Sequence, residues 1–229
     1  MLKLPREIDY SAKPASLPNG TSTISSVSVP SNGSSFTAND VIIVDLPSRG
    51  YLNCSSLYMR YKVVSTGHSA CSVVATPAYT YISKYETLIG SQVVESINNY
   101  GQLCNMIVNC KTTNSQKAGL ANAFGYADTA TVASVNLTNA NCNGRLLAAT
   151  PDTSYYSAPI NCILSNADKQ IPLKFMPAVR LQFTIDTIAN IYQGTTEPTS
   201  FAITNFEVCY DLTDYPSTVD DAVASMTDA

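Results

Sequence analysis

The feature that most constrains the fold of this chain is a strict alternation over residues 179–186. Every second residue there is apolar, and each residue between is polar. The apolar members are Val179, Leu181, Phe183 and Ile185, and the polar members are Arg180, Gln182, Thr184 and Asp186. Successive side chains of a strand point to opposite faces of a sheet, so this period predicts a half-buried strand. Pro172 and Pro177 precede the alternation, where a missing N–H costs least.

A second alternating run, residues 202–212, predicts a partner for this strand. Its apolar face comprises Phe206, Val208, Tyr210 and Leu212. Residues 194–198 separate the two runs, and the glycine and the proline in that segment predict a loop. We expect the two runs to form a long strand pair that serves as a scaffold rather than as a reaction centre.

The same periodicity argument predicts a chain dominated by strands. Further strands are expected at residues 41–44, 57–64, 72–75, 79–89, 145–149 and 157–164. Apolar residues at three- and four-residue steps predict a helix over residues 96–110, with Ser96 as its N-cap. A shorter helix is expected over residues 115–123. Both helices would be insertions between strands.

The two ends of the chain differ from its middle. Residues 1–20 combine charged side chains with several prolines, which predicts either an extended arm or a disordered terminus. Residues 217–220 are spaced as in a capping box, with Asp220 in place of the usual Glu or Gln. Apolar residues on one helical face follow, so a C-terminal helix is expected from residue 217.

Charge is scarce and unevenly distributed. Charged residues make up 13% of the sequence, about half of the roughly 25% of a typical soluble domain. Because interface centres are depleted in charge, such an exterior is compatible with a surface covered by neighbours. Residues 1–180 hold all 13 basic residues and 9 acidic ones, whereas residues 181–229 hold 8 acidic residues. The acidic end is either solvated or docked on a basic surface. No dense basic cluster occurs, so sequence-specific nucleic acid is not expected as a partner.

Residue types for catalysis are poorly represented. His68 is the only histidine, and its Ser- and Gly-containing loop is expected at the surface. A metal site or a nucleophile relay based on histidine is therefore not expected, and no Gly-rich phosphate loop occurs. The seven cysteines are odd in number and lack CxxC spacing, which favours small buried hydrophobes in a reducing compartment. A calcium site near Asp211, Asp214 and Asp220 is the weaker alternative. The sequence thus predicts no enzyme, no cofactor and no metal.

Several segments, in order, resemble the first jelly roll of viral double-jelly-roll major capsid proteins. The most specific is residues 88–103, Leu-Ile-Gly-Ser-Gln-Val-Val-Glu-Ser-Ile-Asn-Asn-Tyr-Gly-Gln-Leu. In that family a strand ending in Gly-x-x-(Val/Ile)-(Val/Ile)-Glu runs into an Ile-Asn-x-Tyr helix. The other similar segments are the early strands at 44–53 and 56–63 and the closing strands at 171–183 and 203–212. The resemblance covers roughly residues 40–216 but a single barrel, whereas the family usually has two.

The resemblance implies an all-β fold, an eight-stranded antiparallel jelly-roll sandwich with one or two short helices inserted between strands. It divides the chain into an extended N-terminal arm (1–30), a jelly-roll barrel (31–216) and a C-terminal helix or linker towards a possible second barrel (217–229). It also implies a structural protein that self-assembles, as trimeric pseudo-hexameric capsomers, into the icosahedral shell of a DNA virus or phage. Such a protein would reside in the virion and be assembled inside the host cell.

The implied partners are further copies of the chain, vertex or minor capsid proteins, and an internal membrane. The expected assembly residues are Lys3, Arg6 and Lys13 in the arm, Arg180 on the polar face of the strand, and Asp220 and Asp221 in the C-terminal helix. Two other interpretations stay open. In the first, the chain is a single-jelly-roll minor capsid, vertex or receptor-binding spike protein, and in the second it is an enzyme.

Overall fold

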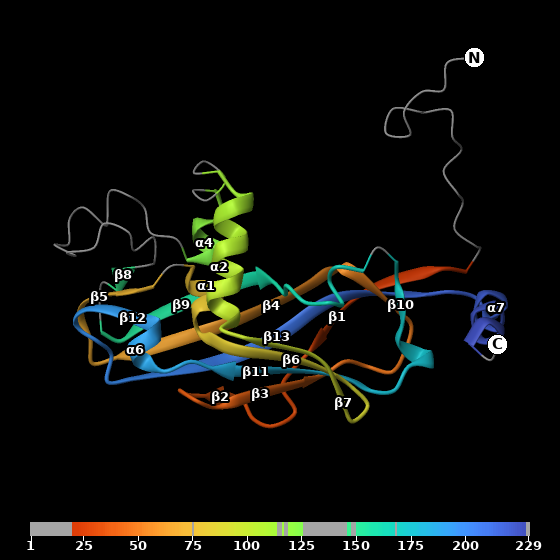
Figure 1. The fold of residues 1–229 in the computed structure, drawn as a ribbon, viewed down its shortest axis with the longest axis horizontal. Coiled ribbons are helices and arrows are strands. Elements are labelled where there is room, and N and C mark those ends of the chain that lie inside the picture. The colour runs from red at the N-terminus through yellow and green to blue at the C-terminus, as the bar shows by residue number, and fades with distance from the viewer. Residues whose placement is uncertain are drawn as a thin grey trace, which may run out of the picture.

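The computed structural model describes residues 20–74, 76–113, 116, 119–125, 146–147, 150–167 and 169–227. The chain folds into an elongated β-sandwich whose strands run along its long axis (Figure 1). One layer is a sheet in which four long strands follow one another side by side, all antiparallel. These strands, in spatial order, are β1 (Ser22–Ser28), β13 (Ser200–Asp214), β4 (Tyr51–Thr66) and β9 (Asp152–Pro159).

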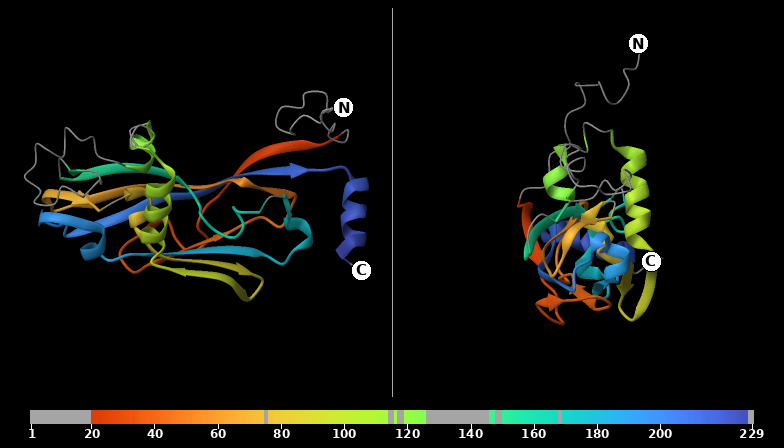
Figure 2. Two further views of the ribbon diagram at one scale, coloured as in Figure 1. Left: turned by 45° about the horizontal axis from the view of Figure 1, so that its top comes forward. Right: turned by 90° about the vertical axis from the view of Figure 1, so that its left-hand side faces the viewer.

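The second layer is a four-stranded antiparallel sheet (Figure 2). Its strands, in spatial order, are β3 (Val41–Asp45), β11 (Val179–Ile185), β6 (Ile82–Ile89) and β7 (Gln92–Asn98). When these eight principal strands are counted along the chain, the two sheets have the orders 1-8-3-6 and 2-7-4-5. This interleaving is that of a jelly roll. The predicted eight-stranded antiparallel jelly-roll sandwich is therefore confirmed.

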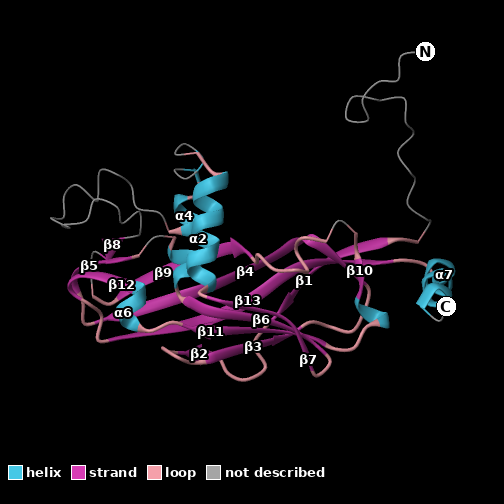
Figure 3. Ribbon diagram, in the orientation of Figure 1, coloured by secondary structure: helices cyan, strands magenta, loops and turns pink. Residues whose placement is uncertain are grey.

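Shorter elements are inserted between the principal strands (Figure 3). The short strands are β2 (Ser35–Phe36), β5 (Ser69–Val73), β8 (Leu146–Leu147), β10 (Ile171–Pro172) and β12 (Tyr192–Thr196). The helices are α1 (Pro77–Thr80), α2 (Tyr100–Lys111), α4 (Ala121–Phe124), η1 (Leu173–Phe175), α6 (Ile188–Ile191) and α7 (Ser217–Thr227). β5, β8 and β12 form a third sheet at one end of the barrel, here called the loop end. α7 lies across the opposite end, here called the α7 end.

The predicted pairing of the two alternating runs is wrong, although their buried faces are correct. β11 pairs with β3 and β6, whereas β13 pairs with β1 and β4 in the other sheet. The two strands meet across the core instead, where the rings of Phe183 and Phe206 lie 5.1 Å apart between centroids. Alternation determines which side chains of a strand are buried, but it carries no information on the neighbouring strand. All four apolar residues of the first run are 3% exposed or less.

β13 changes its alternation in the middle. Phe201 and Ile203 are buried at odd positions, whereas Phe206, Val208, Tyr210 and Leu212 are buried at even positions. The pairing with β4 shifts between Thr204 and Glu207, and Asn205 has a φ of 51°. An extra residue in one strand reverses the faces of all residues that follow, which is the effect of a β-bulge.

Two predicted boundaries differ from those in the structure. Residues 96–98 belong to β7, and α2 begins only at Tyr100, after Asn99 in the left-handed conformation. Ser96 is therefore not an N-cap; its hydroxyl donates to Glu86 Oε1 at 3.0 Å across the β6–β7 pair. At the other boundary, β1 lies inside the expected arm of residues 1–30, where β-branched residues at intervals over 21–29 were compatible with a short strand, and it pairs with β13 along its whole length. The barrel thus begins at about residue 22, because strand pairing rather than composition defines it.

The core is rich in tyrosine, and the hydroxyl groups attach the insertions to the barrel. Tyr61 on β4 donates to the carbonyl oxygen of Ala78 in α1 at 2.9 Å. Tyr79 in α1 donates to the carbonyl oxygen of Pro159 on β9 at 2.8 Å. Tyr100 in α2 accepts from the backbone N–H of Asn161 at 2.9 Å. A buried hydroxyl without a partner is costly, so these contacts orient the inserted helices on the sandwich.

Candidate functional site

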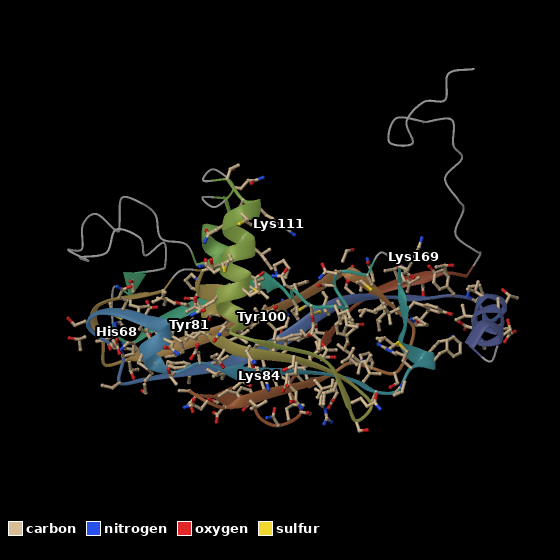
Figure 4. The ribbon with its side chains drawn as sticks, in the orientation of Figure 1. His68, Tyr81, Lys84, Tyr100, Lys111 and Lys169 are labelled. Carbon is tan, nitrogen blue, oxygen red and sulfur yellow. The ribbon has the colours of Figure 1, made fainter. Side chains whose placement is uncertain are left out.

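We first looked for residues that could bind a metal ion. In the described ranges, no group of three or more His, Cys, Asp or Glu side chains could hold a metal ion. The surface position predicted for His68 is wrong, because its side chain is buried at the loop end (Figure 4). Five of the six described cysteines are buried and all six are free, as expected for small hydrophobes. Of the helices in the described part of the chain, none has the length and hydropathy needed to cross a bilayer.

The candidate site is therefore the barrel surface, beginning with the contact that fixes α7. The Tyr51 hydroxyl donates to Oδ1 of Asp220 at 3.0 Å. The ammonium group of Lys174 forms an ion pair with the other carboxylate oxygen of Asp220. Tyr215 packs edge-on against Tyr51, with 5.0 Å between ring centroids, and its hydroxyl donates to Gln170 Oε1 at 2.9 Å. These contacts, here called the α7 clasp, join the helix to the β9–β11 connection and to the start of β4.

The α7 clasp shifts the pKa values of its members. The Lys174 ammonium, followed by the Tyr51 hydroxyl, holds the pKa of Asp220 below its ordinary value of 3.8. Burial, followed by the hydrogen bond to Asp220, raises the pKa of Tyr51 to about 12. At neutral pH the carboxylate is therefore charged and the phenol is protonated, which is the combination that the hydrogen bond requires.

We predict that acid releases α7. A carboxyl group whose pKa is lowered by folding stabilises the folded state above its ordinary pKa, and this contribution disappears as the pH falls through the lowered value. Amide protection in residues 217–227 should fall when the pH drops below 3.8, while protection in β4 persists. Asp220→Asn should show the same loss at pH 7. The exposed neighbour provides the control, since Asp221→Asn should leave protection unchanged; equal losses in both variants would contradict the clasp.

The predicted assembly residues that the structure describes lie on two different elements, β11 and α7. Arg180 lies on the exposed face of β11 and donates to Asp45 Oδ1 on β3 at 2.7 Å. Asp220 belongs to the α7 clasp, and Asp221 is exposed on α7. Lys3, Arg6 and Lys13 lie outside the described residues. Sequence reasoning missed Lys174, which precedes the alternating strand without any periodic signal and meets Asp220 only through the fold.

A hollow of about 590 Å³ lies on the outer face of the β13–β4–β9 sheet. Tyr155 and Asn205 contribute to its lining, and the Tyr155 side chain is 64% exposed. Two of its charges are paired with each other, because Arg60 forms an ion pair with Glu207. The ammonium of Lys62 lies 5.9 Å from the centre of the Tyr155 ring. The hollow thus offers an aromatic platform with polar and charged neighbours, among them the ammonium of Lys62.

Among the exposed large apolar side chains, neighbouring ones occur together on three elements. They are Ile24, Val27 and Val29 at β1, Val93 and Val94 on β7, and Leu103 and Met106 on α2. Scattered apolar residues on a surface are normal, but an outermost strand also has unpaired backbone N–H and C=O groups, and exposed apolar residues there favour association with another strand. The surface therefore offers association at its edges.

The strand order defines the chain as a jelly-roll sandwich protein. No protein-family model matches the sequence, and no curated protein matches it. Among solved structures, the chain is similar to the Faustovirus major capsid protein, with a TM-score of 0.57 and 9% identity over 88% of this chain and 56% of that one. This likeness establishes the fold as a jelly roll of the kind found in a viral major capsid protein.

Two further solved structures are weaker matches. The Sputnik virophage structure has a TM-score of 0.48 and 11% identity, covering 94% of this chain and 53% of that one. The PBCV-1 virus capsid has a TM-score of 0.45 and 14% identity, covering 86% and 43%. The chain thus spans about half the length of the proteins that it matches.

Proposed function

We propose that the chain is a structural capsid protein that self-assembles into the icosahedral shell of a DNA virus or phage. The observation that carries the proposal is the interleaved strand order of this chain, together with its structural similarity to the Faustovirus major capsid protein over 88% of the chain. A jelly roll presents loops at its ends and strand edges at its sides, so it can meet neighbours on several sides at once. No catalytic step is part of the proposal.

In this proposal the barrels stand upright in the shell and associate as trimers with a pseudo-hexagonal outline. The two ends of the barrel differ, which supports a defined inside and outside. β1 begins and α7 lies at one end, whereas the third sheet lies at the other (Figure 1). The arm with Lys3, Arg6 and Lys13 would reach beneath the shell to a neighbouring copy, a vertex or minor capsid protein, or an internal membrane. The chain would then reside in the virion.

A receptor-binding spike is the second candidate, and the hollow beside Tyr155 favours it. Exposed aromatic rings flanked by amide and charged groups are suited to glycans, because the ring covers the apolar face of a sugar and the polar groups bond its hydroxyls. A spike would bind glycans as a discrete oligomer, and Tyr155→Ala would abolish that binding.

The two candidates are separated by electron microscopy and light scattering of the purified chain. Shells, sheets or capsomer arrays would support the capsid function. Discrete trimers that bind glycans through Tyr155 would support the spike and refute the shell. A chain that stays single at all concentrations and salt conditions would contradict both.

Charge reversal at Arg180 should impair assembly more than folding. The Arg180–Asp45 ion pair is exposed, and exposed pairs contribute little to stability. Arg180→Glu should therefore keep the thermal midpoint of the native chain while reducing the yield of assemblies in microscopy. The matched control is the swapped pair Arg180→Glu with Asp45→Arg, which restores the ion pair on the same two strands. If the single variant unfolds, or if the swap also rescues assembly, the positive charge on β11 is not a contact with a neighbour.

A further inference from the structure

The hollow on the outer face of the β13–β4–β9 sheet lies where two rows of side chains cross these strands. In the first row Tyr155 of β9 is opposite Lys62 of β4. In the second row Ser157 of β9 is opposite Arg60 of β4, and Glu207 of β13 continues the row. Every second residue of a strand lies on the same face, so the two rows are neighbours. The lining therefore comes from adjacent strands of one sheet, which hold it in place.

The β-bulge of β13 adds an amide group to this face. Two residues, Asn205 and Phe206, lie between the positions where β13 pairs with Lys62 and with Arg60 of β4. Phe206 is buried in the core, whereas Asn205 has a φ of 51°, is exposed and lines the hollow. A bulge redirects side chains in this way, and bulges are frequent beside functional sites. The amide can both donate and accept hydrogen bonds.

The charges of the hollow leave one ammonium group unpaired. Arg60 and Glu207 form an ion pair with each other. Among the described residues, no carboxylate forms an ion pair with Lys62. The Lys62 ammonium lies 5.9 Å from the centre of the Tyr155 ring, and that side chain is 64% exposed. A ligand in the hollow therefore meets an exposed aromatic ring and an unpaired positive charge at the same time.

We propose that the hollow binds a saccharide that carries a carboxylate group. The Tyr155 ring covers the apolar face of the sugar, and the Lys62 ammonium pairs with the carboxylate. Asn205 and Glu207 bond the sugar hydroxyls. The volume of about 590 Å³ lies within the range of roughly 300–1,000 Å³ that is usual for small-ligand sites. The inference deepens glycan recognition, the second candidate function above, and rests on it for the class of ligand.

Other ligands match the charges of the hollow less well. Single-stranded nucleic acid binds along grooves in which several cations follow its backbone. Of the two cations in the described lining, Arg60 is already paired, and the Glu207 carboxylate beside it repels a phosphodiester. A neutral sugar would use the Tyr155 ring but make no use of the Lys62 charge. One unpaired ammonium group beside one ring therefore favours a sugar with one carboxylate.

Matched sugars test the role of the carboxylate. One pair is methyl glucuronide and methyl glucoside, and the other is the methyl glycoside of N-acetylneuraminic acid and its methyl ester. In each pair the first sugar carries a negative charge and the second does not. Titrations of the native chain followed by nuclear magnetic resonance give the dissociation constants. In at least one pair, the acidic sugar should bind about tenfold more tightly, the effect of one charge-assisted hydrogen bond.

Lys62→Gln separates the charge from the rest of the hollow. This variant should bind the acidic sugar only as well as its neutral partner, with the neutral affinity unchanged. Tyr155→Ala should weaken the binding of both sugars, because both use the ring. The matched control is Lys84→Gln on the outer face of the other sheet, where the ammonium pairs with Glu86. It should change neither affinity, and circular dichroism checks that each variant is folded.

The outcomes distinguish this inference from the functions proposed above. Equal binding of acidic and neutral sugars, lost in Tyr155→Ala, would refute the acidic ligand and leave glycan recognition in place. No binding of any of the four sugars would refute both. An acid preference that survives in Lys62→Gln, or tighter binding of oligothymidylate than of the acidic sugars, would also overturn the inference. Electron microscopy tests the capsid function separately, because normal shells from Tyr155→Ala would keep that function whatever the sugars do.

Discussion

Phe183→Ala is expected to lower the free energy of unfolding by about 3–5 kcal/mol, the range for removing a buried phenylalanine ring. Phe183 is fully buried on β11 and packs against Tyr85 of its own sheet at 5.2 Å and against Phe206 of the facing sheet at 5.1 Å between ring centroids. Alanine would lose the transfer energy of the ring and leave a cavity between two regular sheets that cannot collapse freely. Urea titration followed by circular dichroism measures the change.

Phe175→Ala is the matched control for this loss. The Phe175 side chain is 38% exposed in η1, and a lysine ammonium lies 5.2 Å from the centre of its ring. Phe175→Ala should lower the free energy of unfolding by less than half as much as Phe183→Ala, because part of the Phe175 ring is already in water. Equal losses at the two positions would mean that the facing sheets do not pack on Phe183, and the sandwich described above would be wrong.

The burial at Phe183 was predictable from the sequence, whereas its packing partner was not. Alternation over residues 179–186 determined the inward face of β11, because a strand has only two faces. The choice of neighbours depends on the path of the connections. β11 reaches its neighbours through long-range pairing with β3 and β6, and no local pattern encodes that choice. The jelly-roll fold was predicted from the resemblance at residues 88–103, whereas the strand order was known only from the structure.

The contacts at the surface were less predictable than the core. Arg180 and Asp220 were both expected as assembly residues, but their partners Asp45 and Lys174 are 135 and 46 positions away along the chain. Ionic contacts of this kind depend on which strands lie side by side. By contrast, the sequence alone shows that β1 contains no charged residue, and the structure adds that β1 lies at the edge of its sheet.

Gly101→Ala is expected to destabilise the chain by about 2 kcal/mol, even though alanine favours helices over glycine by about 1 kcal/mol. A Cβ at residue 101 would lie 2.6 Å from the carbonyl oxygen of Tyr79 and 3.1 Å from that of Ile82. Both are backbone atoms, so the first turn of α2 would have to move away from α1. Tyr100 would move with it and strain its bond to the Asn161 N–H.

Gly119→Ala separates this packing cost from the helix propensity of alanine. No atom lies within 4 Å of a Cβ at that exposed position, so the substitution should be neutral or slightly stabilising in the same urea titration. If both variants gain stability, the close approach of α2 to α1 is not required for folding. If only Gly101→Ala loses stability, the absence of a side chain at residue 101 is required for the packing of α2. It lets the inserted helix approach the barrel closely enough for the Tyr100 hydroxyl to reach the connection after β9.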